Sequence, residues 1–86
     1  MDNSRILTTD QLGTFIRQVR KAAGLRQDQL AGVANVGLRF IVDLEAGKPT
    51  AQVGKVLQVL SILGCTVTVM PPPGLELLPP KPRKAK

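Results

Sequence analysis

Four side chains between residues 38 and 43 have the types and the spacing that suit reading of base edges in DNA. If this stretch is helical, Leu38, Arg39, Val42 and Asp43 share its outward face. Arg39 can donate a bidentate pair of hydrogen bonds to guanine O6 and N7, and Leu38 and Val42 can contact a thymine methyl group. Asp43 has two possible roles, because its carboxylate can accept from cytosine or hold Arg39 four residues away. The sequence therefore predicts a surface that contacts double-stranded DNA.

A short helix and a turn are predicted directly before this stretch. The helix begins near Gln27, and its apolar stripe comprises Leu30, Ala31 and Ala34. Asn35 stands where the chain must reverse, and asparagine enters the left-handed backbone region more readily than most residues. This pattern predicts a tight turn between two short helices.

The second helix has its own signals for an inner face and for an end. Its inner face is predicted to comprise Gly37, Phe40, Ile41 and Leu44. Gly37 is also a weak N-cap, Gly47 ends the helix, and Pro49 prevents its continuation. Residues 25–48 are thus predicted to form a helix-turn-helix.

Two more helices and one strand flank this motif. Thr8 and Gln11 form a plausible capping box for a helix that ends at Gly24. Its apolar positions are Leu12, Phe15, Ile16, Val19 and Ala23. A helix from about Ala51 to Leu63 is predicted to end at Gly64 and to turn Val53, Val56, Leu57, Leu60 and Leu63 inward. Cys65, Val67 and Val69 then alternate with Thr66, Thr68 and Met70, which predicts a strand closed by Pro71.

This strand, residues 65–70, has no second strand to pair with inside the folded part of the chain. Its backbone donors and acceptors need a partner, and the same strand of a second copy is one that is always available. A two-fold axis would then give an antiparallel ribbon built from Cys65, Thr66, Val67, Thr68 and Val69 of each copy. The competing arrangement pairs the strand with Ile6 and Leu7, of the same chain or of the partner.

Size and charge are consistent with one small domain that meets a polyanion. The chain has 86 residues and a formal net charge of +6. Solubility alone would explain such a charge equally well, so the helix-turn-helix pattern is what favours DNA. A domain of this size buries limited surface, and we expect a partner subunit to stabilise it.

Composition excludes several kinds of site. The chain has no histidine and one cysteine, which excludes imidazole catalysis, histidine-ligated metals, an intramolecular disulfide and a multi-cysteine zinc site. Its six carboxylates show no pairing typical of acid–base catalysis, so we expect a protein that is not an enzyme and has no cofactor. The start, MDNSRILTT, lacks the apolar core of a signal peptide, and no stretch is apolar enough to span a membrane. We therefore expect a cytoplasmic protein associated with the nucleoid.

The motif resembles the helix-turn-helix of the lambda-repressor and Cro type, also called the XRE family. The positions that match in register are Gln27, Leu30, Ala31, Val36, Ile41, Leu44, Glu45, Gly47 and Lys48. Arg26 stands where that family has a Thr or Ser cap, Asn35 replaces a turn glycine, and Gly37 replaces a Ser cap. These departures lower the expected stability without removing the fold.

The resemblance also implies roles for further residues. Gln27 and Lys48 should contact DNA phosphates, and Arg26 can join them at the free N–H groups that begin the first helix of the motif. Glu45 should form an ion pair with an arginine of the first helix, the one that ends at Gly24, and the register points to Arg20. We favour a structural role for this pair over a functional one.

The wider layout, from Ile6 to about Met70, resembles the HipB-type antitoxins. That resemblance implies a homodimer that represses its own operon at a palindromic operator and neutralises a HipA-like Ser/Thr kinase toxin. Two alternatives stay open: a phage or restriction-modification controller-type regulator, or a protein-binding adaptor without operator specificity.

The expected fold is mainly α: a four- to five-helix lambda-repressor-like DNA-binding domain with one C-terminal β-strand that pairs across a homodimer. Its parts are an N-terminal lead (1–8), the helix-turn-helix domain (9–64), the dimerisation strand (65–70) and a disordered, proline-rich basic tail (71–86). Within the tail, Leu75, Leu77 and Leu78 form an apolar cluster between prolines that could serve as a docking segment.

Overall fold

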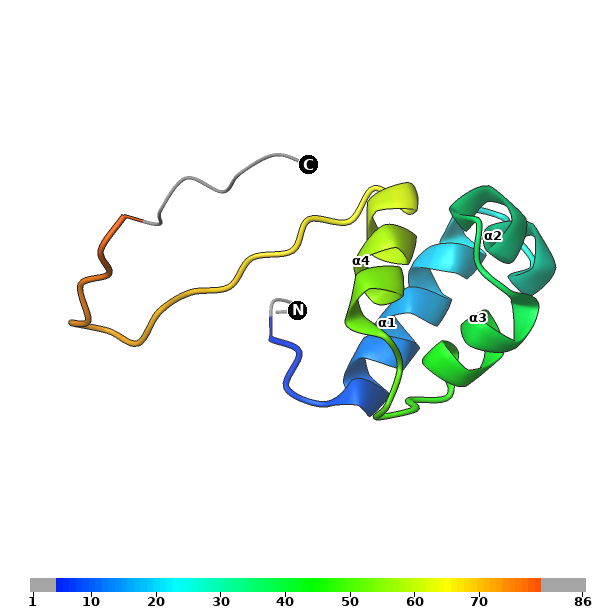
Figure 1. Ribbon diagram of the computed structural model, residues 1–86. Helices are drawn as coiled ribbons and strands as arrows, with labels where there is room; N and C mark the ends of the chain where they lie inside the picture. The colour runs from blue at the N-terminus through cyan, green and yellow to red at the C-terminus, as the bar shows by residue number, and fades with distance from the viewer. Residues whose placement is uncertain (1–4, 80–86) are drawn as a thin grey trace.

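The structure, a computed structural model, describes residues 5–79. Its four α-helices are α1 (Thr9–Ala22), α2 (Gln27–Ala34), α3 (Leu38–Glu45) and α4 (Val53–Ile62). Figure 1 shows the helices gathered into one bundle, with the chain after α4 leading away from it. The start of the predicted lead (1–4) and the end of the predicted basic tail (80–86) lie outside the described residues. The mainly helical fold agrees with the expectation from sequence.

Each helix contributes one large, fully buried side chain to the core. These four side chains are Ile16, Leu30, Ile41 and Val59. The other buried apolar residues are Ala31, Ala34, Leu44, Val56 and Leu60. Because α3 packs against both α1 and α2, and α2 also packs against α4, the helix-turn-helix is held by the rest of the bundle.

Capping explains where the helices begin. The Thr8 hydroxyl accepts from the Gln11 backbone N–H at 3.1 Å, and the Gln11 side chain accepts from the Thr8 N–H at 3.1 Å, which is the predicted capping box. The Arg26 side chain has no acceptor, so α2 begins with only one of the two hydrogen bonds of a capping box. There the Gln29 Oε1 accepts from the Arg26 backbone N–H at 2.9 Å.

All four helices end with the same pair of backbone hydrogen bonds. After α1, Gly24 N donates to Lys21 O and Leu25 N to Arg20 O, and the same pattern follows α2, α3 and α4. The residue with positive φ is a glycine in three of these ends and Asn35, at φ 57°, after α2. Asn35 therefore makes the predicted reversal between α2 and α3.

Gly13 permits the close approach of α1 to α3. A β-carbon at this position would lie 2.5 Å from Leu44 O and 2.7 Å from Glu45 O, both of them backbone atoms. A side chain there would push α3 away from α1.

The prediction for the inner face of α4 was partly wrong. Val56 and Leu60 are buried as expected, but Val53 and Leu57 are exposed and Val59 is buried in their place. Gln58 donates from Nε2 to Ala34 O at 2.6 Å at the end of α2. Because α4 has apolar residues on nearly all sides, its periodicity does not decide which side faces the core.

The prediction that Gly37 lies on the inner face of α3 was also wrong, since this residue is exposed at the N-cap. As the N-cap, Gly37 precedes the first helical residue, so the buried face of α3 begins one turn later, at Ile41.

The predicted strand at Cys65–Met70 is an extended chain without strand hydrogen bonds in the described residues. A ladder needs two strands, and no backbone hydrogen bond joins this segment to Ile6 or Leu7, the alternative partner considered above. The segment instead borders an apolar groove of about 390 Å³ whose other walls include Leu12, Phe15 and Leu57. Pairing across a dimer stays a prediction.

None of the helices in the described part of the chain has the length and apolar character required to cross a membrane.

Candidate nucleic-acid interface

The outward face of α3 presents two apolar side chains and one guanidinium to solvent. Leu38 is 49% exposed and Val42 is 37% exposed, while Ile41 and Leu44 on the opposite face are buried. The Arg39 side chain is 87% exposed. The structure therefore brings together on one surface the residues that the sequence predicted to read bases.

Asp43 lies on the same face between two cations. Its Oδ1 is 3.2 Å from Arg39 Nε, and its Oδ2 is 3.6 Å from Lys48 Nζ. The Asp43 side chain is only 26% exposed, so the carboxylate sits below the guanidinium that it contacts. Lys48 is tied to the end of α3 by its own backbone as well, since Lys48 N donates to Asp43 O at 3.0 Å.

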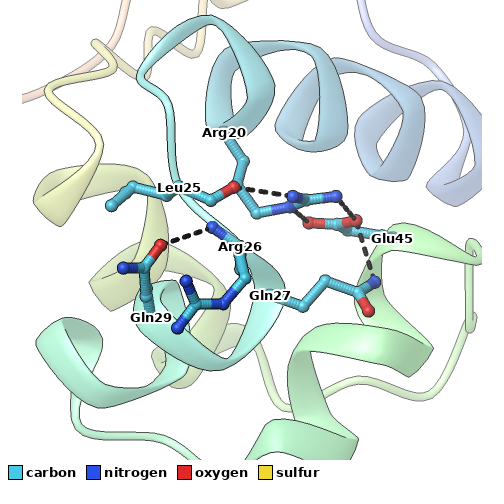
Figure 2. A network of polar contacts seen from close by, with 6 residues as sticks. All are labelled: Arg20, Leu25, Arg26, Gln27, Gln29 and Glu45. Atoms are coloured by element: carbon cyan, nitrogen blue, oxygen red, sulfur yellow. Dashed lines mark hydrogen bonds and ion pairs between the residues drawn. The ribbon is translucent and has the colours of Figure 1, made fainter.

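A buried ion pair fixes α3 against α1. Arg20 Nε lies 2.6 Å from Glu45 Oε2, and Arg20 Nη2 donates to Glu45 Oε1 at 3.0 Å. The third nitrogen, Nη1, donates to Leu25 O at 2.8 Å (Figure 2). The hydrogen bond from Glu45 raises the pKa of the Arg20 guanidinium, so this side chain stays charged at any pH at which the protein folds.

The same carboxylate holds the first residue of α2. Gln27 Nε2 donates to Glu45 Oε1 at 3.1 Å, so Glu45 joins side chains of α1 and α2 to the end of α3 (Figure 2). An amide nitrogen has two N–H donors, which leaves one for another acceptor. The bond to Glu45 thus fixes the position of the Gln27 side chain, while the second N–H of its amide can donate to another acceptor.

Arg26, just before α2, is held by a neighbour on the surface. Its Nε donates to Asp28 Oδ1 at 3.0 Å and its Nη2 to Asp28 Oδ2 at 3.3 Å. The bond to Arg26 lowers the pKa of the Asp28 carboxyl. The Arg26 side chain remains 70% exposed, at the start of α2, where the backbone N–H groups are not bonded within the helix.

Comparison with known proteins assigns the family. A family model described as "Helix-turn-helix domain" matches residues 11–71, which include all four helices apart from the first two residues of α1. The chain belongs to the helix-turn-helix family.

A named relative supports this assignment at the level of sequence. This helix-turn-helix protein is 66% identical over 68 residues to the "Uncharacterized HTH-type transcriptional regulator y4mF" of Sinorhizobium fredii strain NBRC 101917 / NGR234. The match covers 79% of this chain and 90% of the relative.

Solved structures share the fold. A HipB-O4 20mer complex superposes with a TM-score of 0.71 over 78% of this chain and 94% of that chain, at 21% identity. A HipA-HipB-O2-O3 complex gives the same TM-score, coverage and identity. The sequence-based resemblance to HipB-type proteins is therefore matched by the structure of this helix-turn-helix protein.

Sequence reasoning missed one cation close to this surface. Lys55, the single charged residue of α4, has its Nζ 5.8 Å from the centre of the Phe40 ring. It shares a hollow of about 270 Å³ with Lys48 and Asp43. The signal in the sequence was a single charged residue in an otherwise apolar helix. Only the orientation of α4 in the structure shows that this lysine lies near Lys48 and Asp43.

Proposed function

We propose that this helix-turn-helix protein binds double-stranded DNA in a sequence-specific way and represses transcription. The main support is the two-sidedness of α3, which buries Ile41 and Leu44 but exposes Leu38, Arg39 and Val42. An apolar and cationic face on a helix fixed by its bundle suits insertion into the major groove. This function also places the protein in the cytoplasm, where its DNA target is.

Base reading falls to the exposed face of α3. Arg39 donates two hydrogen bonds to a guanine, and this contact discriminates against other bases by about 1 to 3 kcal/mol. Leu38 and Val42 contact thymine methyl groups on either side of it. The operator half-site is therefore expected to contain a guanine next to thymines.

Phosphate contacts come from the two ends of the helix-turn-helix. Gln27 donates its second amide N–H to a phosphate while the first stays on Glu45, which fixes the side chain in advance. Arg26 adds its exposed charge beside the free N–H groups of α2. Lys48, which follows the end of α3, contacts a phosphate of the DNA backbone. Together these contacts set the position of α3 in the groove.

The protein acts as a homodimer through Cys65, Thr66, Val67, Thr68 and Val69. Support comes from the backbone of residues 66–69, which makes no hydrogen bond within the described residues, and from the apolar side chains there, of which Val67 is 52% and Val69 is 89% exposed. An antiparallel ribbon would bond these backbone groups and bury both valines. Two copies related by a two-fold axis would read a palindromic operator.

Among regulators of this fold, we favour the antitoxin of a HipBA-type module that represses its own operon and neutralises a HipA-like Ser/Thr kinase. The support is the likeness of fold to HipB, one of whose solved structures is a HipA-HipB-O2-O3 complex. Co-expression with the product of the neighbouring gene tests this: a stable complex and relief of toxicity are expected. A neighbour that is neither bound nor toxic would favour a phage or restriction-modification controller-type regulator.

DNA binding is tested by measuring the dissociation constants for the protein's own promoter fragment and for a shuffled fragment over a series of salt concentrations. With several phosphate contacts per dimer, affinity should fall by orders of magnitude, about 10³-fold or more, between 50 and 200 mM salt. The preference for the promoter should persist at physiological salt. Weak binding that is equal for both fragments would refute the proposal and favour a protein-binding adaptor.

A further inference from the structure

Asp43 is the one acidic side chain on the outward face of α3. Its carboxylate is already paired with cations of the protein, whereas a base-reading carboxylate would be free to accept a hydrogen bond from a base. Each carboxylate oxygen faces a different cation: Oδ1 faces Arg39 Nε at 3.2 Å, and Oδ2 faces Lys48 Nζ at 3.6 Å. These cations are the proposed base reader and one of the proposed phosphate contacts. The carboxylate thus connects the two kinds of DNA contact made by α3.

The contact to Arg39 uses the nitrogen that guanine recognition does not require. A guanidinium has donors on Nε and on both Nη atoms, and the ion-pair distance of 3.2 Å to Asp43 Oδ1 is measured from Nε. The two terminal nitrogens remain available, and they form a fork that matches guanine O6 and N7. Because the Arg39 side chain is 87% exposed, its terminal nitrogens are accessible to a base while Nε stays next to Asp43.

The position of Asp43 disfavours direct base reading. To accept from the amino group of cytosine, the carboxylate would have to give up at least one of its two cations. Its side chain is 26% exposed, against 87% for Arg39, so the guanidinium extends further from the helix than the carboxylate does. A bare carboxylate would also be repelled by the phosphates on both sides of the groove.

Resting on the DNA-binding function proposed above, we propose that Asp43 is a positioning residue, which fixes Arg39 and Lys48 relative to each other instead of contacting a base. Sequence preference then depends on Asp43 only through Arg39. Ion pairs at exposed sites are worth about 0 to 1 kcal/mol, so the loss of Asp43 should reduce preference by at most roughly fivefold.

The test compares Asp43→Asn with Glu76→Gln, which removes the same charge from the segment after α4. The measured quantity is the ratio of dissociation constants for the shuffled and the own-promoter fragments. Asp43→Asn should lower this ratio roughly two- to fivefold, while binding to the shuffled fragment is unchanged or tighter, because a negative charge is gone. Glu76→Gln should leave the ratio unchanged. Asp43→Glu, which keeps the carboxylate, should retain most of it.

A double-mutant cycle separates positioning from reading. If Asp43 acts through Arg39, Asp43→Asn has no further effect on the ratio in an Arg39→Ala background. An additional loss in that background, or an unchanged ratio for Asp43→Asn alone, would overturn the inference while leaving the proposed function intact. If the unmodified protein shows no preference for its promoter, both proposals fail together.

Discussion

At the scale of single residues, one carboxylate organises the inside of the helix-turn-helix. Glu45 accepts from Arg20 of α1 and Gln27 of α2 while it belongs to α3. The family resemblance, together with the register, predicted Arg20 as the partner of Glu45 but not the bond from Gln27. Such a bond depends on the distance between two helices, and the spacing of residues along one helix gives no information about that distance. The two cations on Asp43 show the same limit, since only the one four residues away could be anticipated from the chain.

Arg20→Ala should reduce stability far more than it alters sequence preference. The substitution leaves Glu45 buried without its cation, a loss of about 3 to 5 kcal/mol in the free energy of unfolding. Since 1 kcal/mol shifts the melting temperature of a domain this size by about 4 to 8 °C, a decrease of more than about 10 °C is expected in thermal denaturation. Arg17→Ala, an exposed change on the same helix, is the control. Equal melting temperatures for the two variants would show that the pair is not structural.

At the scale of helices, caps and turns were the most predictable features. The Thr8 box and the reversal at Asn35 follow from residue types, because each type serves a particular backbone geometry. The rotation of α4 was not predictable, since apolar residues surround it and packing alone selects Val59. The segment 65–70 could be predicted as extended, and its pairing across a dimer stays a prediction.

Gly13→Ala should destabilise the protein, because its methyl group would collide with the backbone of Leu44 and Glu45. Overpacking of this kind costs about 1 to 3 kcal/mol. Gly32→Ala is the matched control: it lies within α2, and a β-carbon there would meet nothing within 4 Å. That change should stabilise α2 by up to about 1 kcal/mol. Chemical denaturation measures both, and a Gly13→Ala variant as stable as Gly32→Ala would contradict the close approach of α1 and α3.

At the scale of the whole molecule, the proposed homodimer would account for the apolar groove and for the extended segment beside it. The groove lies between α1, α4 and residues 65–69. After Cys65, whose N–H still bonds to Leu60 O, the segment leads away from the bundle (Figure 1), and residues 66–69 make no backbone hydrogen bond to another part of the described chain. A monomer would keep this apolar surface in water, whereas a ribbon of two copies would cover it. The same assembly would double the DNA contacts and thus their salt dependence.

Val67→Asp should dissociate the dimer. The residue is 52% exposed in the single chain and would become buried at the centre of the ribbon, where a carboxylate has no partner. Leu77→Asp, a change of equal charge at a residue that is 63% exposed, lies outside the ribbon and should leave the dimer intact. Sedimentation equilibrium measures the molecular mass of each. Val67→Asp that remains dimeric at micromolar concentration would refute the ribbon.

The central claim is that the exposed face of α3 reads an operator through Arg39. The most direct measurement compares binding to the own-promoter fragment and to a shuffled fragment at physiological salt, for the unmodified protein, Arg39→Ala and Arg17→Ala. We expect tight, selective binding that Arg39→Ala relaxes by about 1 to 3 kcal/mol, roughly 5- to 150-fold in the ratio of dissociation constants. Arg17→Ala, which removes the same charge, should leave that ratio unchanged. Equal weak binding of the unmodified protein to both fragments, or selectivity that persists in Arg39→Ala, would contradict the claim.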